Sequence, residues 1–195
     1  MIKIKRRKLR LSAVGFVAAL LTGCGSSDEF YRLNAIDAGP ARSSSGLAIS
    51  VGPVSLPSYI DRAELVFQSA PNQFQIPPGV RWVGSLQENI SRVLAADLGR
   101  ALHSGRVRSS LEPGSAPQYR VAIEIRQFHG ISGDQAVLDL SWRIQDGTGQ
   151  RNISRHNGSY RERIAGDGYK PLVAAESRLL AQCAQAIAAS LRAGN

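Results

Sequence analysis

Two stretches of the chain place apolar residues at the three-to-four-residue spacing of an amphipathic helix. The first is expected to run from about residue 86 to residue 103. Ser85 and Glu88, at its start, have the spacing of a capping box, in which side chains satisfy free backbone amides. The second helix is expected to begin near Pro171, which suits a first helical turn, and to end at Gly194.

Other stretches alternate apolar and polar residues, which is typical of half-buried strands. Residues 119–127, 136–144 and 152–164 follow this pattern, and turn sequences at residues 131–134 and 146–149 join them. Three consecutive strands joined by tight turns predict an antiparallel meander. Shorter alternating stretches predict further strands at residues 30–33, 47–51, 64–68, 73–76 and 107–111.

The order of these elements is strands, helix, strands, helix. The apolar stripe of each helix must be buried, and an antiparallel sheet is the simplest partner for both stripes. The pattern therefore predicts an α+β fold, an α/β sandwich in which a mostly antiparallel sheet carries the two amphipathic helices on one face. Residues 30–195 are expected to form a single domain, because this length can bury a sizeable core.

The segment of residues 51–62 interrupts the strand pattern with two prolines. Pro53 and Pro57 each lack the amide hydrogen that a ladder of strands uses. The segment is therefore expected to leave the sheet, or to lie along its edge, and then to turn.

The first 23 residues have the layout of an export signal. Residues 1–10 carry six Lys or Arg and no acidic residue, and residues 11–21 form a mostly apolar run of about 11 residues. A helix that spans a membrane needs roughly 20 apolar residues. The run is therefore expected to be removed rather than kept as a membrane span.

The end of this signal, Leu21-Thr22-Gly23-Cys24, resembles the lipobox of bacterial lipoproteins. The resemblance implies cleavage before Cys24, a diacylglycerol on its thiol and an acyl chain such as palmitate on its new amino terminus. Burial contributes roughly 0.8 kcal/mol per CH₂, so several chains make a lasting membrane anchor. Residues 24–29 would be the lipidated tether. The alternative is a plain secretory signal with a chance cysteine.

Removing the signal changes the charge of the protein. Residues 1–23 carry six of the 24 Lys and Arg and none of the 15 Asp and Glu, so the net charge of +9 becomes +3 for the remaining 172 residues. This removes most of the argument for a nucleic-acid partner. Cys183 would be the one free thiol left, and its place on the apolar side of the second helix predicts a buried, inert side chain.

No set of residues in the sequence predicts a catalytic or metal site. There is no Gly-x-Ser-x-Gly elbow, no His-Glu-x-x-His motif and no cysteine pair at zinc spacing. His103, His129 and His156 are far apart in the sequence and are expected to be structural or solvent-exposed. Residues 147–149 lack the helix and the Lys-Ser/Thr of a phosphate loop, so they are better explained as a turn. No cofactor is expected beyond the covalent lipid on Cys24.

One stretch carries a distinctive pattern, Ile49-x-Val51-Gly52-Pro53-Val54-x-Leu56-Pro57-x-Tyr59-Ile60-Asp61-Arg62, followed by Leu65-Val66. It resembles the signature of PqiC-like lipoproteins, the auxiliary lipoprotein components of ABC-type transport systems that work with MCE proteins. Ile60 stands where Leu is expected, a conservative departure. A second, weaker block of similarity is formed by Arg81-Trp82, Leu86, Ile90, Arg92-Val93-Leu94 and Asp97-Leu98.

The resemblance implies a non-enzymatic component of lipid transport between the two membranes of a Gram-negative envelope, and so a role in envelope integrity. The lipoprotein would dock an inner-membrane MCE-domain protein at the outer membrane. Gly25 replaces the Asp that commonly retains lipoproteins at the inner membrane, which favours the periplasmic face of the outer membrane. The sequence leaves open whether the protein forms homo-oligomers.

We expect the partner-binding residues to lie in the proline-containing segment, at Pro57, Tyr59, Asp61 and Arg62. Tyr and Arg are enriched at binding hot spots, and the prolines could hold them in a fixed loop. The alternative is that Tyr59 packs in the core and that Asp61 and Arg62 stabilise the turn.

Two other classes of protein share the anchor. A lipoprotein that regulates a periplasmic cell-wall enzyme would have a similar small domain, but it does not predict the pattern of residues 51–62. A lipid-anchored hydrolase is disfavoured by the missing catalytic motifs. A direct lipid carrier would need a deep apolar cavity.

Overall fold

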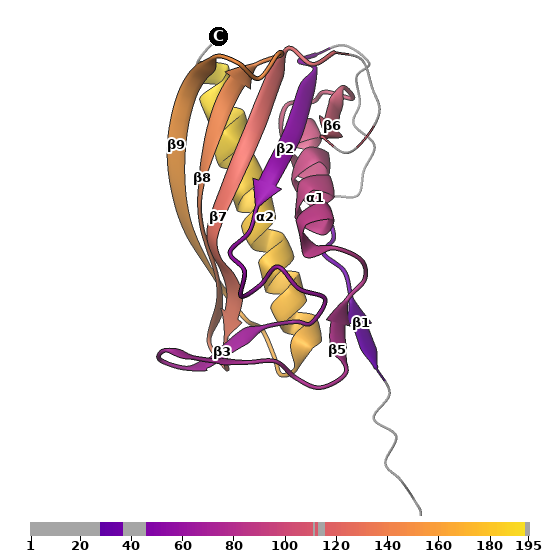
Figure 1. Cartoon of the computed structure of the whole chain (residues 1–195), viewed down its shortest axis with the longest axis vertical. Coiled ribbons are helices and arrows are strands. Elements are labelled where there is room, and N and C mark those ends of the chain that lie inside the picture. Colours follow the sequence, from indigo (N-terminus) through magenta and orange to yellow (C-terminus); the bar gives the residue numbers. More distant parts are fainter. Residues whose placement is uncertain (1–27, 37–45, 111, 113–115, 194–195) are drawn as a thin grey trace, which may run out of the picture.

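The computed structural model describes residues 28–36, 46–110, 112 and 116–193. The predicted signal, the lipobox-like residues 21–24 and most of the tether lie outside these residues, as does most of the loop expected at residues 38–46. In the described part, the chain forms two layers, a twisted sheet and a pair of helices (Figure 1).

Three long strands form one side of the sheet. They are β7 (Tyr119–Ile131), β8 (Gln135–Asp146) and β9 (Asn152–Arg163), and they pair antiparallel in chain order. The predicted meander is confirmed. β9 alternates half-buried and exposed residues along most of its length, whereas β7 alternates buried and exposed residues only from Ile123 to Arg126. Apolar residues on one face of the sheet are turned towards the helices.

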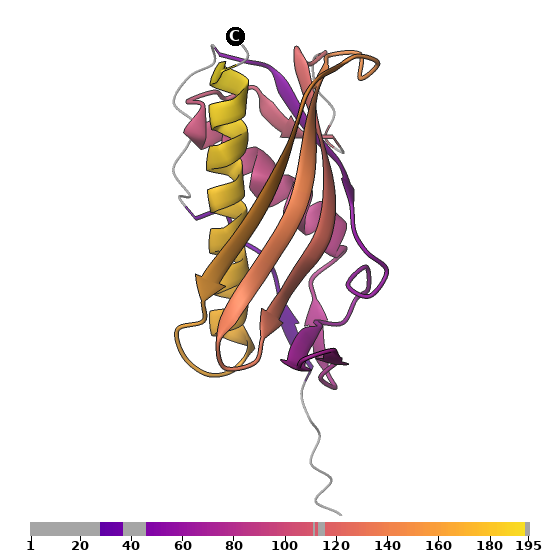
Figure 2. The ribbon, with the colours of Figure 1, turned by 90° about the vertical axis from the view of Figure 1, so that its left-hand side faces the viewer.

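Both predicted helices are present and cover the same face of the sheet (Figure 2). Helix α1 (Leu86–Ala101) begins where predicted, because Ser85 accepts a hydrogen bond from the Glu88 amide at 3.4 Å. It ends two residues early, since His103 has a left-handed φ of 52°. Helix α2 (Tyr169–Ala193) begins two residues before Pro171 and packs along α1, β8 and β9.

The N-terminal half of the chain completes the sheet on the other edge of β7. Strand β2 (Ile49–Ser55) pairs parallel with the first part of β7, and β3 (Phe67–Ala70) pairs parallel with its last residues. Two short strands extend these, β6 (Val107–Ser109) beside β2 and β4 (Gln73–Gln75) beside β3. The sheet is therefore antiparallel along its long strands and parallel where the N-terminal half joins it.

A separate pair of short parallel strands lies at one end of the molecule. It consists of β1 (Glu29–Tyr31) and β5 (Val80–Trp82). β1, β3 and β5 lie at the same end, opposite the C-terminal end of α2, in both views (Figures 1 and 2).

The prediction for the proline segment of residues 51–62, that it leaves the sheet or follows its edge and then turns, is confirmed. Strand β2 lies between β7 and β6 from Ile49 to Val51. It then continues through Pro53 to Ser55 beside β7 alone. The register with β7 shifts between Val51 and Val54, and the pairing with β6 ends at Val51, so the missing amide of Pro53 interrupts no ladder on the β6 side. The chain leaves the sheet after Ser55, and Pro57 begins a turn.

The core lies between the helices and the sheet. The apolar side of α2 is fully or almost fully buried, and each large aliphatic side chain there contributes roughly 1.5–3 kcal/mol. Cys183 is completely buried, as predicted, and burial raises the pKa of its thiol to about 12. The buried members of this stripe are Leu172, Leu179, Leu180, Cys183, Ile187 and Leu191.

Candidate functional site

The loop of residues 57–62, predicted to bind a partner, follows β2 and leads towards β3. The carbonyl of Pro57 accepts hydrogen bonds from the amides of Ile60 and Asp61, at 3.1 and 3.2 Å. These bonds close a tight turn at the end of the strand. The side chain of Ile60 is buried, so the turn is held by its backbone and by the core.

Tyr59 connects this loop to the sheet. Its hydroxyl lies 3.0 Å from Nδ1 of His129, a buried residue of β7. Its ring packs against Phe74, with centroids 5.1 Å apart, and Phe74 packs against His129 at 5.0 Å. Three segments far apart in the sequence therefore meet in one ring cluster, which supports the interpretation that Tyr59 has a packing role.

Burial shifts both polar members of this cluster towards their neutral forms. Burial raises the pKa of Tyr59. It also lowers the pKa of His129, and the positive charge of the nearby Arg161 lowers that pKa further. A neutral imidazole can accept the hydrogen bond that the Tyr59 hydroxyl donates. The cluster therefore fixes the loop without a buried charge.

Arg62 is held by an ion-pair group at the far end of the loop. Its Nε lies 3.0 Å from Glu64, and Arg81 of β5 lies 3.0 Å from the same carboxylate. The hydrogen bond from Arg62, and then that from Arg81, lower the pKa of Glu64 to about 2. The arginines are 41% and 44% exposed, so solvent weakens these pairs.

The predicted binding residues thus have different environments. Tyr59 and Pro57 are partly buried, whereas Asp61 and Arg62 are exposed. The structure brings all four together in one turn whose backbone is fixed. A partner that approaches this turn would meet a charged tip beside an aromatic flank, and the binding role of the loop stays a prediction.

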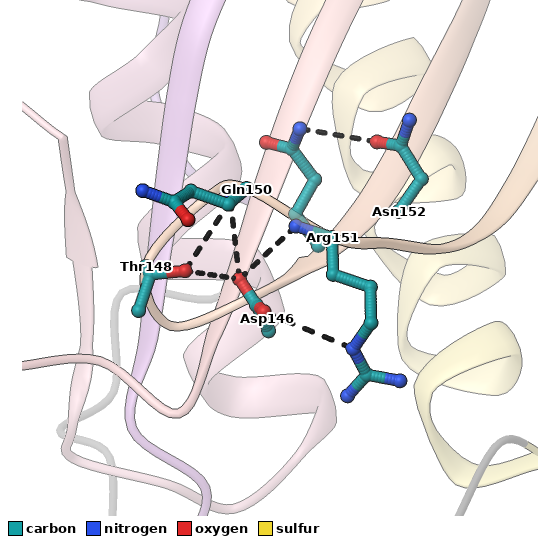
Figure 3. Close-up of polar contacts among 6 residues, drawn as sticks. Asp146, Thr148, Gln150, Arg151 and Asn152 are labelled. Atoms are coloured by element: carbon teal, nitrogen blue, oxygen red, sulfur yellow. Dashed lines mark hydrogen bonds and ion pairs between the residues drawn. The ribbon is translucent and has the colours of Figure 1, made fainter.

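The turn between β8 and β9 has the structural role that its sequence predicts (Figure 3). Asp146 accepts hydrogen bonds from the Thr148 hydroxyl at 2.7 Å and the Gln150 amide at 3.2 Å. The bond from Thr148 is the main cause of the lowered pKa of Asp146. Arg120 of β7 donates to the Gly147 carbonyl at 2.8 Å, so these groups serve the turn itself.

The histidines are dispersed over the fold. His103 is exposed after α1, and His156 lies within β9, where its ring stacks on Trp142 at a centroid distance of 5.3 Å. Among the described residues, no group of His, Cys, Asp and Glu could hold a metal ion, and no helix is long and apolar enough to cross a membrane.

A cavity of about 230 Å³ opens beside the end of α2, lined in part by Ile153, His156 and Ser190. Pockets for small ligands usually hold about 300–1,000 Å³. This cavity is smaller than that range. It does not provide the deep apolar space that a lipid carrier would need.

Glu176 is a feature that the sequence analysis missed. It lies on the buried side of α2, is 1% exposed, and its Oε2 has no hydrogen-bond partner among the described residues. Burial raises its pKa to about 8. Its spacing of four residues from Leu172 and three from Leu179 places it on the apolar stripe, and this signal was available in the sequence.

The fold defines a small, two-layer α+β protein. Residues 31–188 match the family of ABC-type transport auxiliary lipoprotein components, and the chain belongs to this family. The resemblance found in the sequence is thereby confirmed. The family consists of transport auxiliary lipoproteins and is not known as an enzyme family, and its lipoprotein character implies a membrane-associated periplasmic location.

Solved structures show the same fold. The crystal structure of an uncharacterized protein is 22% identical, with a TM-score of 0.68 over 85% of this chain and 99% of that one. Protein XCC0632 from Xanthomonas campestris, of the DUF330 family, is 16% identical, with a TM-score of 0.65 over 82% of this chain and 92% of that one. A comparison with curated protein sequences gives no match.

Proposed function

We propose that this protein is a docking subunit, anchored by lipid at the periplasmic face of the outer membrane, for an MCE-domain protein of the inner membrane. The MCE protein and an ABC-type transporter would form the rest of a path for lipid between the membranes. The observation that carries the proposal is the family match over residues 31–188, which begins directly behind a lipobox-like sequence.

The chain would be divided into three parts. Residues 1–23 direct export and are removed, residues 24–29 form the lipidated tether, and residues 30–195 form the docking domain. Cys24 would carry the diacylglycerol and the N-acyl chain. Gly25 would allow transfer to the outer membrane.

The loop of residues 57–62 is suited to docking because its backbone is already ordered. Its turn hydrogen bonds and the Tyr59–His129 contact hold it in the free protein, so a partner would not need to order it on binding. Asp61 and Arg62 remain exposed at its tip. They would supply the polar part of the contact.

The proposal is tested by purifying the lipidated protein from its own envelope in mild detergent and identifying the co-purified proteins by mass spectrometry. We expect an MCE-domain protein. We also expect its loss when Cys24→Ala prevents anchoring. Recovery of a peptidoglycan synthase without an MCE protein would instead make the protein a regulator of a cell-wall enzyme.

The role of the loop is tested in the same purification with Asp61→Lys. Glu112→Lys is a matched control, because Glu112 is also an exposed acid but follows β6, away from the loop. We expect Asp61→Lys to reduce recovery of the MCE protein while thermal unfolding is unchanged, and Glu112→Lys to change neither. Equal recovery with both variants would remove the loop from the interface.

A further inference from the structure

Large apolar side chains are exposed at one end of the molecule. Phe30 of β1 is 59% exposed, and Phe74 of β4 and Ile76, just after β4, are each 44% exposed. We refer to these three residues as the apolar end. Exposed apolar groups of this size cost free energy in water unless a partner covers them.

The two segments that carry these residues are joined to each other. The chain runs from Ile76 directly to β5, which pairs with β1, and the Glu29 amide donates to the Gly79 carbonyl at 2.7 Å. β1, β3 and β5 are seen at the same end in two perpendicular views (Figures 1 and 2). Residues 30, 74 and 76 therefore belong to one end of the domain.

Further aromatic rings lie behind the apolar end. Tyr169, at the start of α2, packs against Tyr31 and Phe67 with centroid distances of 6.3 and 6.1 Å. Tyr59 packs behind Phe74. Rings with an apolar body and a polar tip are enriched where a protein meets the boundary between lipid headgroups and acyl chains.

The chain between Cys24 and the first described residue is short, so the apolar end must lie near the lipid anchor. Asp28, the first described residue, is four positions after Cys24, and an extended chain over four positions spans at most about 14 Å. Asp28 lies against Gly79, since a side-chain carbon built at Gly79 would be 3.1 Å from Asp28 Oδ1. An acyl group on Cys24 would thus hold the apolar end, and not the opposite end, within reach of the bilayer.

We propose that the apolar end is a membrane-contact surface and that Phe30, Phe74 and Ile76 enter the boundary between headgroups and acyl chains beside the lipid anchor. The inference rests on the proposed acylation of Cys24, because three side chains alone would bind weakly and the anchor keeps them at the surface. The long sheet would then stand away from the membrane, with α2 pointing its C-terminal end towards the periplasm.

The contact is expected to be apolar rather than electrostatic. The charges near this end are of both signs: Arg62 and Arg81 share Glu64, and the exposed acids Asp28 and Glu29 precede Phe30, with the exposed Arg32 after it. Insertion should therefore be similar in vesicles of zwitterionic phosphatidylcholine and in vesicles that also contain an anionic lipid.

The test uses residues 24–195 coupled through the Cys24 thiol to a maleimide lipid in phosphatidylcholine vesicles. Cys183 does not compete, because it is completely buried. Phe74→Trp reports on the apolar end, and Ile153→Trp is the matched control, since Ile153 is exposed to a similar degree, 39%, but lines the cavity near the end of α2. The natural Trp82 and Trp142 are 6% and 4% exposed, and the emission of the protein without an added tryptophan, measured in the same vesicles, is subtracted.

When the vesicles contain brominated acyl chains, we expect the added emission of Phe74→Trp to fall by roughly half, because interfacial residues lie about 5–10 Å into the boundary. Emission of Ile153→Trp should not change. Equal emission of Phe74→Trp in brominated and plain vesicles overturns the proposal. A concentration-dependent shift of its emission without vesicles would also overturn it, in favour of a second copy of the chain.

A failure of the quenching experiment can be distinguished from a failure of the proposed docking function. The maleimide supplies the anchor, so quenching does not depend on natural acylation. The intact mass of the protein purified from its envelope reports acylation of Cys24 independently. Thermal unfolding of both tryptophan variants shows that each is folded before coupling.

Discussion

At the residue scale, buried Glu176 makes the stability of the fold depend on pH. Its carboxyl is buried without a partner for Oε2, and its pKa is raised from 4.5 to about 8. The folded protein therefore keeps the proton that the unfolded chain releases above pH 4.5. The stability that depends on Glu176 is complete below that pH, declines as the pH rises towards 8, and stays low above it.

We expect Glu176→Gln to remove this decline. The variant should be more stable than the natural protein at pH 8, by several degrees in Tm, and the difference should shrink towards pH 5, since each unit of pKa is worth about 1.4 kcal/mol. Thermal unfolding of both proteins across this range measures the difference. A constant difference at every pH would mean that Glu176 is not protonated in the fold.

Tyr59→Phe should test the packing role of Tyr59. The change removes a hydrogen bond to His129 Nδ1 and leaves a buried acceptor without a partner, so we expect a loss of about 1–3 kcal/mol. Chemical denaturation at neutral pH measures it. If the variant is as stable as the natural protein but fails to capture the MCE protein, the hydroxyl acts at the interface instead.

His129 adds a pH dependence of opposite sign. Its pKa is lowered by burial, so the fold holds a neutral ring that becomes protonated more readily when unfolded. Its contribution to stability is complete above pH 6.5 and is lost as the pH falls through and below that value. We expect His129→Gln to weaken this acid-side loss while Glu176→Gln leaves it intact. Denaturation curves at pH 5 and pH 7 for both variants distinguish the two groups.

At the element scale, the contact between β7 and α2 depends on a residue without a side chain. A side-chain carbon at Gly130 would lie 2.3 Å from Cδ1 of Leu172, so an alanine there has no room unless α2 or Leu172 moves. This close approach lets the start of α2 pack directly on the end of β7.

We expect Gly130→Ala to destabilise the protein by about 1–3 kcal/mol, as overpacking of a core does. Adding Leu172→Ala should recover part of that loss, although Leu172→Ala alone leaves a cavity. Chemical denaturation of the two single variants and the double variant gives the coupling free energy between Gly130 and Leu172. Strictly additive losses would show that the two residues are not in conflict.

Local patterns predicted most of the elements but not how distant segments pair. The periodicity of apolar residues predicted both helices and the meander, because these elements are formed by residues close together in the sequence. The parallel pairing of β2 and β3 with β7 joins residues about 70 positions apart, and no local pattern specifies that register. The same limit applies to the site, where Tyr59, Phe74 and His129 meet only through this pairing.

At the scale of the whole molecule, the domain has two differently built ends. The end near the described N-terminus carries exposed Phe30, Phe74 and Ile76, while the far end carries the small cavity and the end of α2. With Cys24 acylated, this polarity would orient the sheet away from the bilayer. The loop of residues 57–62 would then lie near the membrane-facing end, since Tyr59 packs against Phe74 and Arg62 shares Glu64 with Arg81 of β5. A partner that binds its exposed Asp61 would therefore dock close to the outer membrane.

The most direct test of docking is site-specific photo-crosslinking from position 61 in the lipidated protein, in an intact envelope. Position 112 serves as the control, because it is exposed but follows β6. We expect a crosslink from position 61 to an MCE-domain protein and none from position 112. A crosslink from position 61 to a cell-wall synthase, or an MCE crosslink from position 112 alone, would contradict it.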